Sequence, residues 1–376
     1  MNFKDIGVIA PILSALEEKG YVQPTEIQKQ AIPVVLSGKD LIGCAQTGTG
    51  KTGAFAIPIL QSLSKQKEKS FKTRALILVP TRELAIQIDQ NISFYAKNLS
   101  LSHLAIFGGV PQKKQVDAIR KGVDVLIATP GRLMDLVGQG IVHLDAVKCL
   151  VLDEADNMLD MGFIHDIKRI LAKIPKNRQS LLFSATMPTA IRKLAADILT
   201  NPKEISVTPV SSTVEKINQM VMFMEKKQKP IVLSDLLNQK EYKQTLVFTR
   251  TKHGADRLAK SLIKKNVNSV CIHGNKSQNA RQKALALFKA GEIPVLIATD
   301  IAARGIDIKE LPHVINYDLP EDPETYVHRI GRTGRAGKTG HAISFCSPEE
   351  RQLLQKIEKL IGFKIGSKKE KINNNK

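Results

Sequence analysis

The chain has 376 residues, of which 43% are hydrophobic, and a formal net charge of +20. This length allows two or three domains of ordinary size, and the composition is that of a soluble globular protein. There is no apolar run of about 18 residues and no basic-then-apolar N-terminus, so we expect neither a membrane span nor a signal peptide. The charge favours a polyanionic partner, with a basic surface that serves only solubility as the alternative.

The four cysteines are isolated from one another, at positions 44, 149, 271 and 346. They form no Cys-x-x-Cys pair and lie in apolar, strand-like segments. We therefore expect buried, reduced thiols in a cytoplasmic protein. Because His and Cys show no metal-ligand spacing, no zinc site is expected.

The N-terminal segment is expected to form two helices. Residues 4–20 show a helical pattern that ends at Gly20, and Pro24 closes a turn after it. Thr25 fits the N-cap position of the next helix, because its hydroxyl can accept a hydrogen bond from a free backbone N–H group.

Residues 45–52 read Ala-Gln-Thr-Gly-Thr-Gly-Lys-Thr, between a strand-like segment, 40–44, and an apolar helix start, 53–60. A phosphate-binding loop needs this order of strand, glycine-bearing loop and helix. Glycines let backbone N–H groups turn inward, and the helix N-terminus adds partial positive charge. Lys51 would reach the β- and γ-phosphates of ATP, and Thr52 would ligate Mg²⁺. A glycine-rich turn with a chance lysine is the alternative, which the flanking elements weaken.

Short apolar strands alternate with helical stretches after this loop, which indicates βαβ units and parallel sheets covered on both faces. The predicted strands are residues 75–79, 125–128, 149–152, 180–183, 204–207, 217–224, 245–248, 269–272, 295–298, 313–317 and 341–346. The sequence Val-Leu-Ile-Ala-Thr occurs twice, at 125–129 and 295–299, and a polar loop follows each copy. This repeat is a hint of two similar α/β halves.

The boundary between the halves is predicted at the polar stretch 208–216. Residues 1–207 would form an N-terminal ATP-binding domain, and residues 217–362 a C-terminal domain without a phosphate loop of its own. Residues 363–376 are rich in lysine and asparagine, so we expect them to be a short, disordered basic tail.

Three carboxylates, Asp153, Glu154 and Asp156, follow the predicted strand 149–152. An acid at the carboxyl end of a strand beside a phosphate loop is well placed to hold Mg²⁺, and we assign this role to Asp153. Glu154 is then the candidate base that orients the attacking water. A helix start that carries acids to suit its dipole is the alternative.

Ser184 and Thr186 follow another predicted strand. Their hydroxyls could cap a helix, which Pro188 would suit, or relay the state of the γ-phosphate through hydrogen bonds. The spacing leaves both interpretations open.

Residues 328–335 read His-Arg-Ile-Gly-Arg-Thr-Gly-Arg, with arginines three apart. The glycines would weaken a helix, so a solvated helix face explains this pattern poorly. Arginine forks suit phosphate oxygens and the charge that develops in phosphoryl transfer. With the loop in one half and the arginines in the other, we expect ATP in a cleft whose closure permits hydrolysis.

Other polar residues fall where a predicted strand ends, and could hold a phosphodiester backbone. They are Thr81, Arg82, Gly108, Gly109, Thr129, Pro130, Gly131, Arg132, Thr249, Arg250, Gln278, Arg281, Thr299 and Asp300. Each alone fits an ordinary cap or turn, but together with the charge they favour nucleic acid. Aromatic residues are only 5% and Trp is absent, so we expect a grip on the backbone with little sequence specificity.

Together these motifs resemble the DEAD-box ATP-dependent RNA helicases of helicase superfamily 2, and look most like the bacterial RhlE-type branch. The family is named after Asp-Glu-Ala-Asp, here residues 153–156, and the resemblance runs from residue 3 to about residue 346. It implies two tandem RecA-like domains joined by a flexible linker, with ATP and Mg²⁺ as cofactors and RNA as partner. Two mild departures are Glu26, where proline is common, and Gly53, where alanine is common.

The resemblance also implies roles at the nucleotide. Phe3, Tyr21 and Gln28 would recognise adenine, with Gln28 reading the base edge, while Gly305 and Asp307 would lie near the ribose and phosphates. The ATP loop itself would consist of Ala45, Gln46, Thr47, Gly48, Thr49, Gly50, Lys51 and Thr52.

In the second half, the resemblance makes Arg332 and Arg335 arginine fingers and gives His328 a place at the domain interface. Ser184 and Thr186 would couple hydrolysis to strand separation. Pro80 and the strand-end residues named above would line the RNA path.

The family mechanism is local: ATP and RNA close the cleft, one strand is bent, and hydrolysis reopens the cleft. A DNA-directed helicase and a non-catalytic RNA clamp are the alternatives, and the clamp could dispense with Glu154, Arg332 and Arg335. Ribosomal or RNA-decay proteins are compatible partners, and the sequence does not choose between them.

Overall fold

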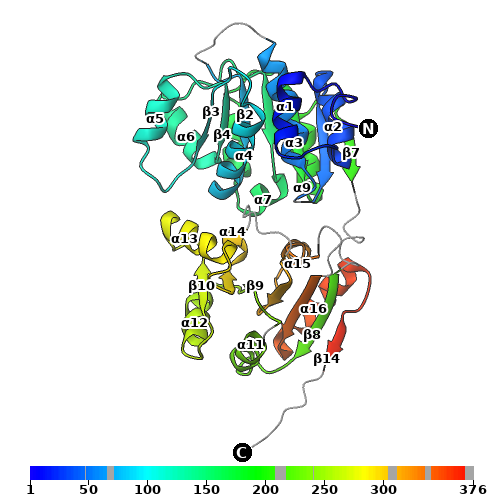
Figure 1. Cartoon of the computed structure of the whole chain (residues 1–376), viewed down its shortest axis with the longest axis vertical. Helices are drawn as coiled ribbons and strands as arrows, with labels where there is room; N and C mark the ends of the chain where they lie inside the picture. Colours follow the sequence, from blue (N-terminus) through cyan, green and yellow to red (C-terminus); the bar gives the residue numbers. More distant parts are fainter. Residues whose placement is uncertain are drawn as a thin grey trace, which may run out of the picture. The chain divides into compact units, whose positions relative to one another are not determined.

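The computed structural model describes residues 1–46, 48–65, 72–207, 217–239, 241–303, 311–334 and 340–368. The chain divides into two compact units, Met1–Thr208 and Pro209–Lys376. Each contains a seven-stranded parallel sheet flanked by helices (Figure 1). The predicted α/β class with two parallel sheets is therefore confirmed.

In the first unit, strands and helices alternate along the chain. The strands are β1 (Leu41–Ala45), β2 (Ala75–Leu78), β3 (His103–Ile106), β4 (Val125–Ala128), β5 (Cys149–Leu152), β6 (Gln179–Ser184) and β7 (Lys203–Val207). The helices are α1 (Ala10–Glu18), α2 (Glu26–Leu36), α3 (Lys51–Ser64), α4 (Arg82–Tyr95), α5 (Lys113–Arg120), α6 (Pro130–Gly138), α7 (Ala155–Asp160), α8 (Ile164–Leu171) and α9 (Thr189–Ile198). The strand order is β3-β4-β2-β5-β6-β1-β7. Since these pairs are parallel, the carboxyl ends of the strands share one edge.

The second unit repeats this alternation. Its strands are β8 (Ile217–Phe223), β9 (Thr245–Phe248), β10 (Ser269–Ile272), β11 (Val295–Ala298), β12 (His313–Asn316), β13 (Gly340–Cys346) and β14 (Gly366–Lys368). Its helices are α11 (Lys229–Leu237), α12 (Lys252–Ile263), α13 (Gln278–Lys289), α14 (Asp300–Ala303), α15 (Pro323–Ile330), the 3-10 turn η1 (Pro348–Glu350) and α16 (Arg351–Ile361). The strand order is β10-β11-β9-β12-β13-β8-β14.

The two sheets have the same topology. If β1 is matched with β8, β2 with β9 and so on to β7 with β14, the two strand orders are identical. The repeated sequence Val-Leu-Ile-Ala forms β4 in one unit and β11 in the other, at the same position of the sheet. The hint of two similar α/β halves is thus confirmed.

The expected disordered tail is wrong at its start. The side chain of Ile365 is buried, and its backbone N–H donates to Glu358 Oε1 over 3.0 Å. The next three residues form β14, which pairs in parallel with β8. An ordered seventh strand therefore follows α16, and residues 369–376 lie outside the described residues.

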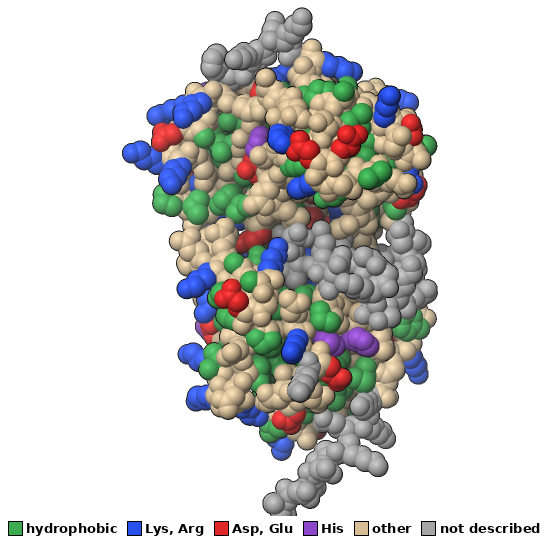
Figure 2. Space-filling model, viewed as in Figure 1, with side chains coloured by type: hydrophobic (Ala, Val, Ile, Leu, Met, Phe, Trp, Pro, Cys, Tyr) green, Lys and Arg blue, Asp and Glu red, His purple; other side chains and the backbone are tan. Residues whose placement is uncertain are grey.

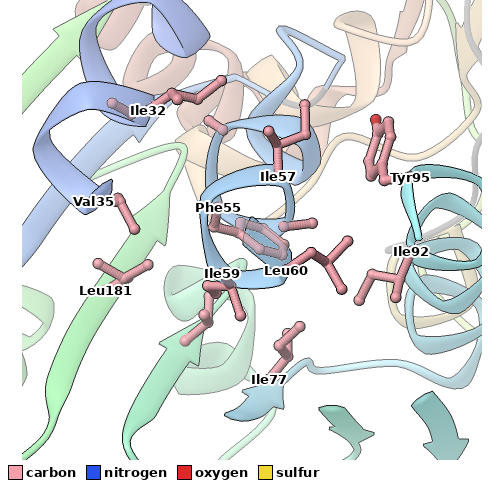
Figure 3. Packing of buried hydrophobic residues seen from close by; sticks show 14 of the residues in the cluster. Ile32, Val35, Phe55, Ile57, Ile59, Leu60, Ile77, Ile92, Tyr95 and Leu181 are labelled. Carbon is pink, nitrogen blue, oxygen red and sulfur yellow. The ribbon is translucent and has the colours of Figure 1, made fainter. Parts of the chain in front are cut away.

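Two apolar cores cover the two faces of the first sheet. Successive residues of β2 alternate between them: Ile77 belongs to one core, and Leu76 and Leu78 to the other, as the two-residue period of a strand requires. Figure 3 shows Phe55 of α3 packed among Ile59, Leu60 and Ile77 in the first of these cores. Truncating such a side chain typically costs about 3–5 kcal/mol, so packing holds the start of α3 firmly in place.

Two expectations from composition can be compared with the structure. Among the described residues, no helix combines the length and apolar character that crossing a membrane needs. All four cysteines are free; Cys149 and Cys346 are buried as expected, but Cys44 and Cys271 are partly exposed. On the face shown in Figure 2, Lys and Arg side chains are spread over both units.

Candidate functional site

The predicted phosphate loop joins β1 to α3. Gly48 and Gly50 have φ angles of +92° and +96°, which residues with a side chain rarely adopt, so glycine is required at both places. Thr49 Oγ1 donates to the Gln46 carbonyl over 2.7 Å and braces the turn. Thr47 lies outside the described residues. Helix α3 begins directly after the loop, and its free N–H groups are there to meet an anion.

Lys51 is the first residue of α3, and its ammonium group is buried without a hydrogen bond from the described residues. The residue is 6% exposed, and its Nζ has no hydrogen-bond partner within the part of the chain that the structure describes. A buried cation in this state costs several kcal/mol unless an anion joins it. The side chain is thus prepared for an anionic ligand.

The lysine at the equivalent position of the second unit has a hydrogen-bonded ammonium group. Lys229 is the first residue of α11, which follows β8 as α3 follows β1. Its Nζ donates to Glu350 Oε2 over 2.6 Å and to the Tyr317 carbonyl over 2.7 Å. The second unit satisfies its lysine internally, whereas the first leaves Lys51 for a ligand.

Gln28 braces the phosphate loop from α2. Its Oε1 accepts the N–H of Thr25, the N-cap of α2 as predicted, and its Nε2 donates to the Gly50 carbonyl; both distances are 3.0 Å. A Cβ atom at Gly53 would lie 2.6 Å from the same Nε2. The missing side chain at Gly53 therefore leaves room for the Gln28 amide.

The two aromatic residues predicted beside adenine differ in exposure. Phe3 is 4% exposed and belongs to the apolar core, whereas Tyr21 is 46% exposed. The Tyr21 ring meets Phe94 edge-on, with the ring centroids 6.4 Å apart. Tyr21 is thus the one of the two whose ring is open to a ligand.

Asp153 follows β5 and is 2% exposed. Its Oδ1 accepts the backbone N–H of Glu154 over 2.9 Å. Burial raises the pKa of this carboxyl to about 7, while the positive charge of Lys51 opposes the rise. A bound cation beside Asp153 would favour the ionised carboxylate.

Glu154 stands in a strained backbone position. Its φ and ψ are 54° and 51°, in the left-handed region that non-glycine residues seldom enter. Its Oε2 accepts a hydrogen bond of 2.8 Å from Asn157 Nδ2. The backbone conformation and this bond together fix where the carboxylate lies, which suits a group with a positional role.

Asp156 links the acidic segment to the end of β6. Its Oδ2 accepts hydrogen bonds from the N–H groups of Ala185 and Thr186 and from Thr186 Oγ1, over 3.0–3.1 Å. In return, Ser184 Oγ accepts the Asp156 N–H over 3.2 Å, at the first turn of α7. Ser184 therefore caps α7 from another strand, and Thr186 belongs to a network that a relay would need. Asp156 was not among the predicted site residues, although it stands beside Asp153 and Glu154 in the sequence.

The sheet order divides the carboxyl edge of the first unit into two parts. The phosphate loop, Asp153 and Ser184 lie at the carboxyl ends of β1, β5 and β6, which are neighbours. The predicted backbone-binding residues follow β2, β3 and β4, which are neighbours on the other side. Two ligands could thus bind to one edge of the same sheet.

The second part contains close packing between predicted site residues. Gly109 has a φ of +75°, which favours glycine, and the missing side chain leaves room for the guanidinium group of Arg82. Arg132 donates to Gln115 Oε1 over 3.2 Å and to the Val110 carbonyl over 3.0 Å. These contacts orient two arginines at the ends of neighbouring strands.

The remaining predicted residues of this part have simpler places. Thr81 caps α4 by accepting the Leu84 N–H, and Thr129 precedes the first turn of α6, where Pro130 is buried and Gly131 exposed. Pro80 is buried, and Gly108 is partly exposed.

In the second unit, the corresponding edge carries the second group of predicted residues after β9, β10 and β11. Thr249 is fully buried, whereas Arg250 is exposed and donates to the Leu319 carbonyl over 3.2 Å. Gln278 opens α13 after the N-cap Ser277. Arg281 lies one turn later on this helix, and Thr299 directly precedes α14.

Two of the three arginines three residues apart, Arg329 and Arg332, lie within the described residues. Arg329 is buried and holds Asp300 through two bonds, from Nε over 2.6 Å and from Nη2 over 2.8 Å. Its Nη1 donates to Asn316 Oδ1 and to the Asp318 carbonyl. Arg329 is therefore a residue that ties α15 to β12 and α14, a role that the even spacing did not reveal.

Arg332 and His328 lie next to this network. Both line a small pocket together with Asp300, Thr325 and other residues of the second unit. Three further predicted residues, Gly305, Asp307 and Arg335, lie outside the described residues.

Comparisons with known proteins agree with this geometry. Two family models match the chain, DEAD/DEAH box helicase over residues 25–194 and helicase conserved C-terminal domain over residues 228–337. The DEAD-box ATP-dependent RNA helicase CshA of Bacillus subtilis is 42% identical over 370 residues, which cover 98% of this chain and 74% of that protein. CshA of Limosilactobacillus reuteri is 41% identical over 360 residues, which cover 96% and 72%.

Solved structures give the same result. The structure of S. cerevisiae Dbp5 bound to RNA and ADP BeF3 is similar with a TM-score of 0.88 at 32% identity, covering 98% of this chain and 95% of that one. The match covers both units of this chain, so its two sheets correspond to the tandem RecA-like domains of such helicases. The chain therefore belongs to the DEAD-box family and is an ATP-dependent RNA helicase, an enzyme that hydrolyses ATP.

Proposed function

We propose that this helicase binds ATP at the loop after β1 and uses the binding and hydrolysis of ATP to separate short RNA duplexes locally. Lys51 would bind the β- and γ-phosphates, Gln28 and Tyr21 the adenine, and Glu154 would orient the attacking water. The observation that carries this proposal is the buried ammonium of Lys51, which has no hydrogen-bond partner among the described residues, whereas Lys229 in the equivalent position is paired with Glu350.

Thr52 and Asp153 fit a magnesium ion, because a hydroxyl and a carboxylate are hard oxygen donors of the kind that Mg²⁺ prefers. When bound, the ion would neutralise charge on the phosphates during transfer. Asp153 would hold the ion, and Lys51 would share the phosphate oxygens with it.

Magnesium affinity is expected to depend on pH through Asp153. Its pKa of about 7 in the free protein means that the carboxyl carries a proton below this pH and must lose it to bind the ion. The affinity should rise about tenfold per pH unit up to pH 7 and then level off. Titration of Mg²⁺ in the presence of a fluorescent ATP analogue would measure this. In Asp153→Asn the slope should decrease to the part that the terminal phosphate of the nucleotide contributes, and an undiminished slope would exclude Asp153 as its cause.

We also propose a path for the signal from ATP to RNA. Asp156 joins the segment of Asp153 and Glu154 to Ser184 and Thr186, so a shift of this segment on phosphate release would reach β6 through hydrogen bonds. The resemblance stated above supports this coupling, and the four bonds to Asp156 give it a physical route.

RNA would lie along the residues that follow β2, β3 and β4 in the first unit and β9, β10 and β11 in the second. These residues are arginines, hydroxyls and helix starts, which hold phosphates and do not read bases. We therefore propose binding with little sequence specificity.

The test of the proposed function is phosphate release by the full chain with single-stranded RNA, with DNA of the same sequence, or with neither. Stimulation by RNA alone is expected, together with unwinding of a short RNA duplex. Equal stimulation by DNA would favour a DNA-directed helicase. Binding of RNA without any ATP turnover would favour a non-catalytic clamp.

The second unit would complete the ATP site when the two units close on each other. We propose that Arg332 and Arg335 supply the charge that stabilises the transferred phosphoryl group, with His328 beside them. Gly305 and Asp307 would lie near the ribose and phosphates. The bidentate pair of Arg329 and Asp300 supports this, because it anchors α15. Arg332 is the second residue after the end of this helix.

The finer assignments also stay proposals. The domains are proposed as residues 1–207 and 217–362, with 208–216 as linker. The RhlE-type branch remains a prediction, since the relatives compared above carry the name CshA. A cytoplasmic location follows from the reduced cysteines, and ribosomal or RNA-decay proteins are compatible partners.

A further inference from the structure

Three side chains that can ligate a metal meet at the edge of the second sheet, and none of them is among the proposed ATP or RNA residues. Cys271 and His273 are two residues apart, so they lie on the same face of β10 and its continuation. Val270 and Ile272 point to the opposite face of the sheet, where they pack in an apolar core of the second unit. Helix α12 covers the first face, and its Asp256 approaches both side chains. Because β10 is the edge strand, solvent reaches this cluster.

The distances suit a shared ion. Cys271 Sγ lies 3.4 Å from Asp256 Oδ1, and His273 Nε2 lies 3.1 Å from Asp256 Oδ2. One donor atom from each of the three residues lies within 4.8 Å of the other two. Tetrahedral zinc with bonds of about 2.0–2.3 Å places its ligands about 3.3–3.8 Å apart. Small side-chain rotations would therefore bring the three donors onto one ion.

His273 lies deep in this cluster and is 2% exposed. Its Nδ1 makes no hydrogen bond within the described residues, and its Nε2 lies 3.1 Å from Asp256 Oδ2. A metal ion would take the place of a proton between this nitrogen and the carboxylate, since the imidazole nitrogen and the carboxylate oxygen are both zinc ligands.

Lys276 now supplies the positive charge at this position. Its Nζ lies 3.0 Å from Asp256 Oδ1, and this contact, with that of His273, holds the pKa of Asp256 well below its usual range. Burial raises the pKa of Cys271 to about 11, so the thiol carries its proton at neutral pH. The Lys276 side chain is 36% exposed and can turn toward solvent without burying its charge.

We propose that Asp256, Cys271 and His273 form a zinc-binding site that Lys276 occupies as a competing cation. Zn²⁺ would bind to the Asp256 carboxylate, Cys271 Sγ and His273 Nε2, with water from solvent as the fourth ligand. The Cys271 thiol would release one proton to solvent, and Lys276 would leave as an intact ammonium ion. The sequence alone does not predict this site. Cys271 and His273 are only two residues apart, and the third ligand, Asp256, lies on a helix 15 residues before Cys271.

The test is a titration of the full chain with Co²⁺ as a spectroscopic substitute for zinc, in excess Mg²⁺ so that hard oxygen sites are filled. One equivalent is expected to bind with a thiolate-to-cobalt charge-transfer band, to release one proton, and to be displaced by Zn²⁺. Cys271→Ser should abolish the band, and His273→Gln should lower the affinity about a hundredfold or more. Lys276→Ala should raise the affinity, since it removes the competitor.

Cys44→Ser is the matched control, because Cys44 is also a free, partly exposed cysteine but lies in the first unit. It should leave the band unchanged. Thermal unfolding of each variant shows whether it is folded, and Lys276→Ala, which alters an exposed side chain, tests the site even if His273→Gln does not fold. A band that survives in Cys271→Ser, or an affinity that does not change in Lys276→Ala, would overturn the proposal.

Discussion

Replacing Lys51 by methionine is expected to abolish ATP hydrolysis and yet leave the free protein no less stable. Loss of a charge aimed at the transferred phosphates should lower turnover by about a hundred- to a thousandfold or more. The free energy of unfolding should not fall, because the substitution removes a buried ammonium group that has no hydrogen-bond partner among the described residues and keeps most of the apolar volume. Phosphate release and urea unfolding would measure the two effects.

Lys229→Met is the matched control for this variant. It makes the same change at the equivalent position of the second unit, but Lys229 is paired with Glu350. Breaking this buried ion pair should cost about 3–5 kcal/mol of stability, because the longer contact with Arg250, 3.4 Å, is then the one ion pair left to Glu350 among the described residues. Opposite effects on stability at the two lysines are therefore expected. If Lys51→Met proved as destabilising as Lys229→Met, Lys51 would have a structural partner and its assigned role would be wrong.

Glu154→Gln is expected to slow hydrolysis by about a hundred- to ten-thousandfold while ATP-dependent binding of RNA persists. Glutamine keeps the size of the side chain and can still accept the hydrogen bond from Asn157 Nδ2, so the strained backbone at residue 154 should be preserved. Only the ability to orient and deprotonate water is lost. The variant should accumulate in an ATP- and RNA-bound state.

Two measurements separate this prediction from a folding defect. RNA binding by fluorescence anisotropy with ATP and magnesium should be at least as tight as in the unaltered chain, and single-turnover hydrolysis should be slow. Asn157→Ala serves as the control, since it removes the bond to Glu154 Oε2 and keeps the carboxylate. Turnover at the normal rate in Glu154→Gln would exclude Glu154 as the group that activates water.

Much of the nucleotide half could be predicted because its signals are local. The strand, the glycines and Lys51-Thr52 follow one another in the sequence. The backbone itself requires glycine at positions 48 and 50, as their positive φ angles show. Asp153 and Glu154 are likewise consecutive and come directly after β5. What depends on distant parts of the chain is the neighbourhood of β1, β6 and β5, which brings these segments together, and the bond from Gln28 to the Gly50 carbonyl.

The features that the sequence did not predict concern residues whose partners lie far away in the sequence. The start of the tail was expected to be disordered because it is short and basic, yet β8 pairs with residues 366–368. The repeat does carry a signal for this strand: if β11 matches β4, a strand matching β7 is due after α16. Arg329 and Arg332 look alike in the sequence, and only the position of Asp300 on α14 makes Arg329 a buried ion-pair residue.

The alternation of strands and helices, the phosphate loop and the family can be predicted from the sequence, because they depend on the apolar period and on residues that are consecutive in the chain. The tertiary structure decided which of two equivalent lysines is left unpaired, that Asp156 joins Ser184 and Thr186, and that Asp256 meets Cys271 and His273. The physical reason is that the ionic state and bonding of a buried side chain are set by its neighbours in space, and parallel sheets draw those neighbours from strands far apart in the chain.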